Sequence, residues 1–174
     1  KFLKKGDDKT PIIIGPSESM SKSKKNTIDP EKMIENFGAD SVRMFILSDS
    51  PPEKDVQWSD EGMRSSYKFI QKLWILNYKI LEEIKANHSS NSDNSIDKVT
   101  NKFIKNVTDN INNFAYNKII ANFHEIHSTL NKIISDKIDK KKLIENYVKI
   151  LITISPVVPH FAEECLNILG IKRK

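Results

Sequence analysis

The sequence predicts a mainly α-helical protein, in which a short β-hairpin, a basic loop and two short helices precede an antiparallel helical bundle. Apolar residues recur every three to four positions in the long segments after residue 59, the spacing of helices that bury one face. Proline, glycine and polar clusters separate these segments and mark the turns between helices. With 174 residues, the chain is long enough to bury a sizeable core.

The N-terminal residues predict the hairpin. Residues 2–5 and 11–14 are short strand-like runs. Residues 6–8, Gly-Asp-Asp, lie between them and suit a tight turn. We therefore expect two paired strands directly before the basic loop.

Two short helices are expected between residues 30 and 47. Asp29 is placed to cap the first of them, Pro30 suits its first position, and Gly38 would end it. The second helix would cover residues 39–47 and leave Arg43 on its polar side. By spacing, the residues that face the core would be Val42, Phe45 and Ile46.

Residues 51–58 are expected to form an extended crossing between these helices and the bundle. Pro51 and Pro52 cannot continue a helix. Val56 and Trp58 are the apolar residues of the crossing, and we expect them to anchor it against the bundle.

Five helices are predicted for the rest of the chain. Ser59 is placed to cap the first, and Pro159 suits the first turn of the last. The polar residues 87–94 would form a loop, Asn112 and Asn113 a break, and residues 135–142 a charged turn. The predicted helices cover residues 59–86, 95–114, 116–133, 143–154 and 160–169.

The most informative segment is the basic loop, residues 19–26, which reads SMSKSKKN. It places the lysines Lys22, Lys24 and Lys25 beside serine hydroxyls, and both groups suit phosphate oxygens. By composition alone, a solvated Ser/Lys linker or a localisation patch is favoured for such a segment.

The charge of the chain allows a polyanionic partner. The formal net charge is +5, and the positive excess lies in the C-terminal half, where residues 95–174 hold 13 basic and 8 acidic side chains. A basic helical surface would suit a polyanion such as tRNA. Lysines scattered over solvated faces would give the same count, so both interpretations remain open.

Several classes of protein and site are disfavoured by composition. No apolar run is long enough for a membrane span or a signal peptide, so we expect a cytoplasmic protein, or a matrix protein if it is organellar. The single cysteine, Cys165, excludes an intramolecular disulfide and suits a small core position. His124 and His127 are three residues apart, but no further ligand completes a metal site, and none is predicted.

Four segments carry a resemblance to a known family. SMSKSKKNTIDP and GADSVRMF are similar to the KMSKS loop and the following helices of class I aminoacyl-tRNA synthetases. SDSPPEKDVQWSDEG narrows the resemblance to leucyl-tRNA synthetases of the bacterial or organellar kind, and SPVVPHFAEECLNILG resembles their last bundle helix. Ser19 stands where the family usually has its first motif lysine, whereas Met20, Ser21, Lys22 and Ser23 match.

The resemblance implies a function in leucine activation. Lys22 corresponds to the lysine that the family uses against the ATP phosphates, so it is the implied catalytic residue. The implied ATP-binding residues, with Mg²⁺ arriving on the ATP, are Ser19, Met20, Ser21, Lys22, Ser23 and Lys24. The implied partners are leucine, ATP, tRNA(Leu) and the rest of the same polypeptide, in a monomer.

The resemblance also implies a domain organisation. Residues 1–50 would end the catalytic domain, residues 51–58 would cross to the bundle, residues 59–170 would form the tRNA-binding domain of the anticodon-binding type, and 171–174 would be a truncated tail. Because no His-x-Gly-His element occurs, we expect the chain to be an excised piece that is inactive alone.

Two alternative functions are kept. A stand-alone basic helical RNA-binding module would explain the basic C-terminal half but not the ordered motifs. A sister class I enzyme, the isoleucyl, valyl or methionyl synthetase, would explain the motifs, because this chain lacks the pocket residues that select the amino acid.

Overall fold

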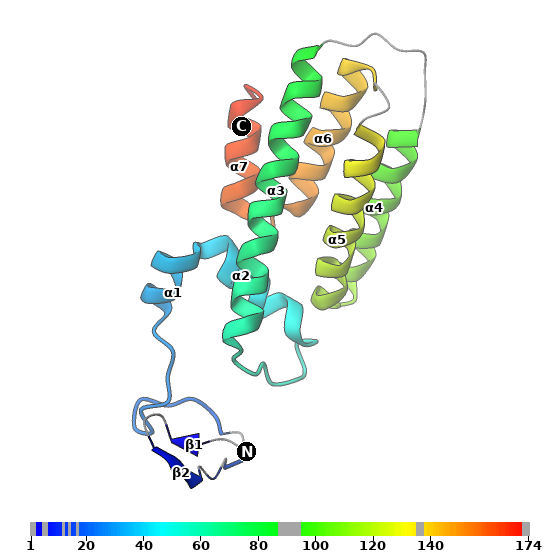
Figure 1. Cartoon of the computed structure of the whole chain (residues 1–174). Helices are drawn as coiled ribbons and strands as arrows, with labels where there is room; N and C mark the ends of the chain where they lie inside the picture. Colours follow the sequence, from blue (N-terminus) through cyan, green and yellow to red (C-terminus); the bar gives the residue numbers. More distant parts are fainter. Residues whose placement is uncertain are drawn as a thin grey trace. The chain divides into compact units, whose positions relative to one another are not determined.

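The computed structural model describes residues 3–4, 7–11, 13, 15–16, 18–86, 95–134 and 138–171 (Figure 1). These residues divide into two compact units, Lys1–Pro30 and Glu31–Lys174, and each is described by itself below. The predicted loop at 87–94 and most of the predicted tail at 171–174 lie outside the described residues. Within the part of the chain described, no helix is both long and apolar enough to cross a membrane.

The first unit contains two short strands, and the second of them is not where the sequence predicts it. β1, Leu3–Lys4, pairs antiparallel with β2, Asp7–Pro11. Asp7 and Asp8, which were expected in the turn, therefore belong to β2, whereas Ile13 lies outside any strand. Pro11, the last residue of β2, has no N–H to donate to a longer ladder.

Helices α1, Pro30–Phe37, and α2, Ala39–Asp49, begin where the sequence predicts them. Gly38 joins them with φ of 79°, a left-handed conformation that favours glycine. The buried face of α2 differs from the prediction, because Ile46 is 51% exposed and Met44 is buried instead. The buried residues of α2 are Asp40, Ser41, Met44 and Phe45. Asp40 and Ser41 are polar, so a search for apolar spacing cannot identify them.

The crossing after α2 is only partly extended. Pro51 to Lys54 form a turn, in which the Lys54 amide donates to the Pro51 carbonyl at 3.0 Å. Trp58 packs on α2 as well as on the bundle: its ring lies edge-on to Phe45 of α2 with centroids 5.2 Å apart, and its Nε1 donates to Asp60 Oδ1 of the next helix at 2.7 Å. Val56 does not anchor the crossing, because 42% of this side chain is exposed.

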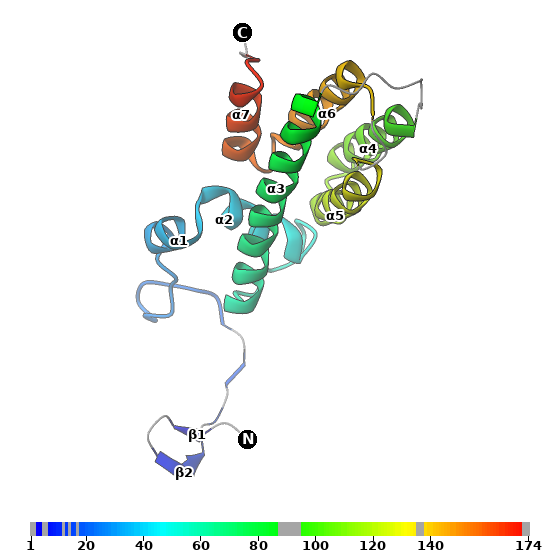
Figure 2. The ribbon, with the colours of Figure 1, turned by 45° about the horizontal axis from the view of Figure 1, so that its top comes forward.

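The second unit continues as a bundle of helices, seen from two directions in Figures 1 and 2. α4 packs on α5 and α6, α3 packs on α2, α5 and α6, and α7 packs on α6. The helices are α3, Asp60–Ala86; α4, Ser95–Asn112; α5, Tyr116–Ile133; α6, Lys140–Ile154; and α7, Pro159–Ile168.

Local capping explains where two of these helices begin. The Ser59 hydroxyl accepts a hydrogen bond from the Gly62 amide at 3.1 Å, which confirms the predicted cap of α3. α6 starts earlier than predicted, because the Asp139 carboxylate accepts from the Lys142 amide at 3.1 Å and draws the predicted charged turn into the helix. The cap at Asp139 thus allows the three lysines at 140–142 to form the first turn of α6, although their charges repel one another.

One apolar core runs through the bundle and includes Met44 of α2. Leu151 and Cys165 are fully buried, and Phe123 is almost so. Cys165 is therefore the small core residue that the sequence predicts. The buried Asn77 is satisfied in part by the Tyr147 hydroxyl, which donates to Asn77 Oδ1 at 2.8 Å.

Candidate functional site

The basic loop forms a tight turn that its own serines hold. The Lys25 amide donates to the Lys22 carbonyl at 3.2 Å, which closes the turn. The Ser21 hydroxyl accepts from the Lys24 amide at 3.3 Å and lies 3.2 Å from the Ser23 hydroxyl. The hydroxyls of Ser21 and Ser23 therefore take part in the hydrogen bonds of the turn.

Asn26 closes the base of the turn. Its Oδ1 accepts a hydrogen bond from the Ser21 amide at 2.8 Å, and its Nδ2 donates to the Ser19 carbonyl at 3.4 Å. One side chain therefore joins the two ends of the loop. Lys25, inside the loop, has φ of 53°, which places a non-glycine residue in the left-handed region.

The three lysines of the loop are not equivalent. Lys24 Nζ lies 2.8 Å from Glu18 Oε2, an ion pair in which both side chains are about half exposed. Lys22 and Lys25 are exposed, and no ion pair of either is found among the described residues. The acid that engages Lys24 precedes the SMSKSKKN segment, so the composition of that segment does not reveal it.

The six predicted ATP-binding residues lie on this one loop. Hydrogen bonds bring Ser21, Ser23 and Lys24 together, and Ser19 takes part through its carbonyl. The Met20 side chain is 47% exposed. Lys22 begins the turn and is exposed to solvent. The loop therefore presents a cation at the start of a turn that polar contacts define.

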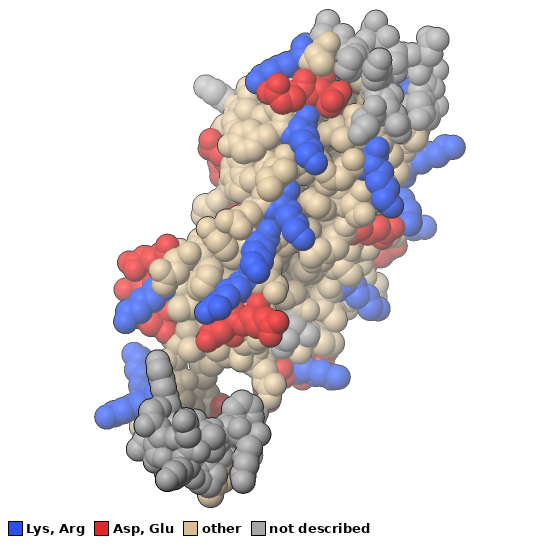
Figure 3. Space-filling model, in the orientation of Figure 1, with Lys and Arg blue, Asp and Glu red and all other residues tan. Residues whose placement is uncertain are grey.

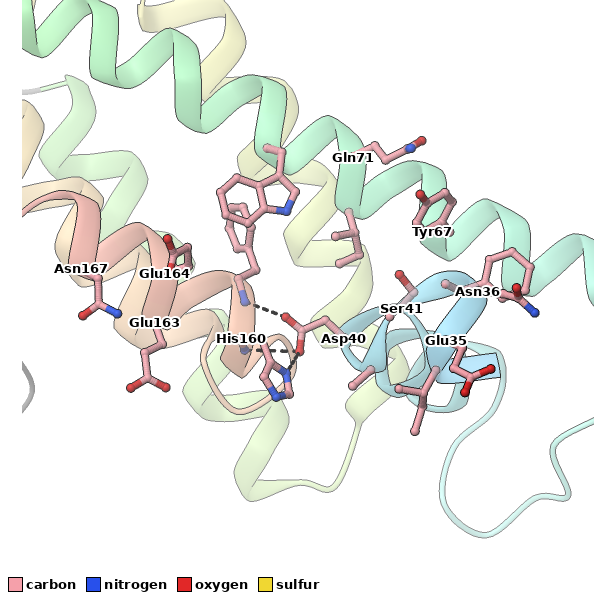
Figure 4. A pocket seen from close by; sticks show the side chains of 17 residues that line it. Glu35, Asn36, Asp40, Ser41, Tyr67, Gln71, His160, Glu163, Glu164 and Asn167 are labelled. Atoms are coloured by element: carbon pink, nitrogen blue, oxygen red, sulfur yellow. Dashed lines mark hydrogen bonds and ion pairs between the residues drawn. The ribbon is translucent and has the colours of Figure 1, made fainter. Parts of the chain in front are cut away.

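A second site lies where α2 meets the start of α7. Two of the segments that carry the family resemblance meet there, GADSVR (residues 38–43) and PHFAEE (residues 159–164). A cavity of about 810 Å³ is lined by residues of α1, α2, α3 and α7. In Figure 4, the Asp40 carboxylate of α2 points to the first turn of α7. It accepts from the His160 amide at 3.3 Å, from the Phe161 amide at 2.7 Å, and it lies 2.8 Å from His160 Nδ1.

Asp40 thereby caps α7 from another helix. The amides at a helix N-terminus have no partner within the helix, and a carboxylate both satisfies them and suits the helix dipole. Asp40 is only 7% exposed, and those contacts offset the cost of burying its charge. Sequence reasoning did not identify this residue, because its partners lie 120 residues away.

Arg43, three residues further along α2, holds the turn that precedes α7. Its Nη2 donates to the Pro156 carbonyl at 2.6 Å and its Nε to the Val157 carbonyl at 3.1 Å. Arg43 is exposed, as predicted, but it is also bonded. Asp40 and Arg43 together fix the connection between α6 and α7.

A basic stripe runs along α3. Four exposed cations recur on one face of this helix: Arg64, Lys68, Lys72 and Lys79. Figure 3 shows lysine and arginine side chains following α3 across this face, with acidic side chains at both ends of the run. Acidic residues in and around α3 nearly balance these cations. Counted along the sequence, the positive excess therefore falls in residues 95–174 and not in α3.

His124 and His127 both pack against Phe69 of α3. Their ring centroids lie 3.8 and 5.5 Å from that of Phe69. Burial, and then the nearby Lys72 charge, lower the pKa of His124, and burial is also the largest cause of the lowered pKa of His127. In the described residues, no three His, Cys, Asp or Glu side chains are grouped as a metal site.

Comparison with protein families divides the chain at α3. Residues 13–59, which contain the loop, α1 and α2, match the model of class I tRNA synthetases (I, L, M and V). Residues 93–174, which contain α4 to α7, match the anticodon-binding domain of tRNA ligases. The two regions of the chain are thus similar to two parts of tRNA ligases. The contacts of Asp40 and Arg43 at the start of α7 join these two matched regions.

Similar curated proteins are leucine–tRNA ligases. One from Cereibacter sphaeroides is 40% identical over 165 residues, which cover 94% of this chain and 19% of the relative. Others from Bartonella quintana and Rickettsia massiliae are 37% and 38% identical, over 95% and 94% of this chain and 20% of each relative. The chain therefore spans about a fifth of the length of the relatives that it matches.

A solved structure shares the fold. It is the ternary complex of an Agrobacterium radiobacter LeuRS with tRNA and LeuAMS, and it matches with a TM-score of 0.77 and 22% sequence identity. The match covers 88% of this chain and 21% of that one. The fold described above is thus also found in that LeuRS.

Proposed function

We propose that this chain is part of a leucine–tRNA ligase, in which it carries the ATP-phosphate loop and the tRNA-binding bundle. The identity to leucine–tRNA ligases across 94% of the chain is the observation that carries the proposal. The complete enzyme would join leucine to ATP and transfer the leucyl group to tRNA(Leu). It would act in the cytoplasm as a monomer, with the rest of the polypeptide supplying the pocket for leucine.

Lys22 is the proposed catalytic residue. In the first reaction, the leucine carboxylate attacks the α-phosphorus of ATP, the bond to the pyrophosphate oxygen breaks, and negative charge builds on the leaving pyrophosphate. An ammonium that reaches those oxygens as the bond breaks stabilises the transition state more than the ground state. Lys22 is exposed and has no ion pair among the described residues, so its charge is available for this role.

The donor set of the loop fits ATP phosphates. The ammonium groups of Lys22 and Lys24 and the hydroxyls of Ser19, Ser21 and Ser23 all donate to phosphate oxygens in proteins. Met20 would contribute contact area, since 47% of its side chain is exposed. No cluster of metal ligands exists among the described residues, so Mg²⁺ would arrive bound to the ATP.

Domain roles follow from the same proposal. Residues 1–50 would end the catalytic domain, residues 51–58 would cross to the bundle, residues 59–170 would bind tRNA, and residues 171–174 would be a tail. The basic stripe on α3, Arg64, Lys68, Lys72 and Lys79, is the proposed contact to the tRNA backbone. Such contacts position the RNA without reading its sequence, and they weaken as salt increases.

The test of the proposal is Lys22→Ala in the full-length enzyme. We expect leucine-dependent exchange of pyrophosphate into ATP to slow by about 100-fold or more, because one preorganised charge donor is lost. Lys98→Ala, which removes an exposed lysine of α4, is the matched control and should leave the rate unchanged.

Unchanged exchange in Lys22→Ala would refute the role of this lysine. The choice of amino acid is tested separately, by comparing leucine with isoleucine, valine and methionine in the same exchange assay. Activation of one of the other three in preference to leucine would favour a sister enzyme of the class.

A further inference from the structure

Lys22 lies on an exposed turn with few contacts that could fix its position. The turn is closed by one backbone hydrogen bond of 3.2 Å, from Lys25 to Lys22. Lys25 is itself in the left-handed region, at φ of 53°, which costs a non-glycine residue conformational energy. A turn of this kind persists only where other contacts hold it.

Asn26 supplies the contacts that span the whole loop. Its amide accepts from the Ser21 N–H at 2.8 Å and donates to the Ser19 carbonyl at 3.4 Å. Both partners precede Lys22, whereas Asn26 follows Lys25, so one side chain joins the two ends of the turn. Among the described residues, the contacts between Ser21, Ser23 and Lys24 lie within the turn. The ion pair of Lys24 with Glu18 links the inside of the turn to the residue before Ser19, but both of its side chains are about half exposed, so it holds the turn weakly.

We infer that Asn26 is the positioning residue of this loop: it bridges Ser21 and Ser19 and so fixes the turn that presents the Lys22 ammonium to the ATP phosphates. The inference rests on the proposed function of Lys22. Asn26 itself need not touch ATP, because its amide is already engaged on both sides. Its effect on the reaction therefore passes through Lys22, and this dependence can be measured.

A double-mutant cycle in the full-length enzyme tests the inference. Asn26→Ala should slow leucine-dependent pyrophosphate exchange by about 10-fold through kcat, with the KM for leucine unchanged, because loop order is lost while the leucine pocket is intact. In the Lys22→Ala background, the same substitution should slow the reaction by less than about 2-fold, because a residue that acts through Lys22 has nothing left to position.

Two further variants separate positioning from folding. Asn26→Gln keeps an uncharged amide with both the acceptor and the donor, and should recover part of the lost rate. Thr27→Ala changes the neighbouring exposed residue and should have no effect. Thermal unfolding of every variant should match that of the parent enzyme.

The outcomes are distinct. If Asn26→Ala slows pyrophosphate exchange equally in the parent enzyme and in the Lys22→Ala background, the positioning role is overturned. It is also overturned if Asn26→Ala has the parent rate while Lys22→Ala is slow. A normal rate in Lys22→Ala itself would instead overturn the proposed function of the loop.

Discussion

The basic loop and the helical bundle are stabilised in opposite ways. In the loop, exposed side chains hold the backbone through a few polar contacts, such as the 2.8 Å bond from Ser21 to Asn26. In the bundle, side chains such as Leu151 are removed from water entirely. Exposed polar contacts contribute little to stability, whereas buried apolar area contributes most of it. Substitutions in the loop should therefore change catalysis, and substitutions in the bundle should change stability.

The largest effect on stability is expected from the core of α6. Leu151→Ala should lower the free energy of unfolding of this chain by about 3 kcal/mol, through lost burial and a cavity. The adjacent Ile152 is 51% exposed, so Ile152→Ala should cost less than about 1 kcal/mol. Urea unfolding followed by circular dichroism measures both. Equal losses at the two positions would contradict the packing of α6 described above.

A smaller loss is expected at the contact between α2 and α7. Asp40→Ala should lower the free energy of unfolding by about 1–3 kcal/mol, because the amides of His160 and Phe161 lose their acceptor. Glu163→Gln, an exposed change on α7, is the control and should be nearly neutral. Asp40 makes polar contacts, as the loop residues do, but it is buried, as the core residues are. Its substitution therefore tests whether burial explains the difference between the loop and the bundle. If Asp40→Ala were also neutral, burial would not be what separates the two regions.

The smallest effect is expected from Cys165 at alkaline pH. Burial is the main cause that raises the pKa of this thiol to about 12, against an ordinary value of 9.0. Between those values the thiol ionises only in the unfolded chain, so stability is full below pH 9 and falls as the pH rises toward 12. From pH 8 to pH 10 the loss should be about 1 kcal/mol.

The same titration with Cys165→Ala isolates this contribution. The variant lacks the thiol, so its loss of stability over the same pH range should be smaller than that of the parent chain. Parallel curves for the two proteins would show that the thiol does not contribute.

Local signals were enough to predict that each helix exists and, apart from α6, where it begins. Ser59, Gly38 and Pro159 act on their own neighbours, through capping, a left-handed turn and a restricted φ angle, and each marks a helix end where the sequence predicts it. The spacing of apolar residues then identifies most of the buried faces of α5 and α6, but only part of that of α3, where Phe69, Leu76 and Ile80 are also buried. It fails on α2, where Asp40 and Ser41 share the buried face and displace Ile46.

The contacts of the candidate sites could be predicted only in part. The loop itself is visible in the sequence, because lysines and serines cluster there. The roles of Glu18 and Asn26 depend on how the turn folds, and the sequence gives no spacing rule for them. The partners of Asp40 and Arg43 lie more than 110 residues away, and a single sequence carries no signal for such pairs.

The separation between Asp40 and His160 has a kinetic consequence. Their contact closes a stretch of 120 residues, so it can form only after the intervening helices have come together. A contact that is absent from the folding transition state leaves the folding rate unchanged when it is removed, and the whole loss appears as faster unfolding. The contact of Asp40 with α7 is therefore expected to slow unfolding. In stopped-flow measurements, Asp40→Ala should unfold faster than the parent chain and refold at the same rate.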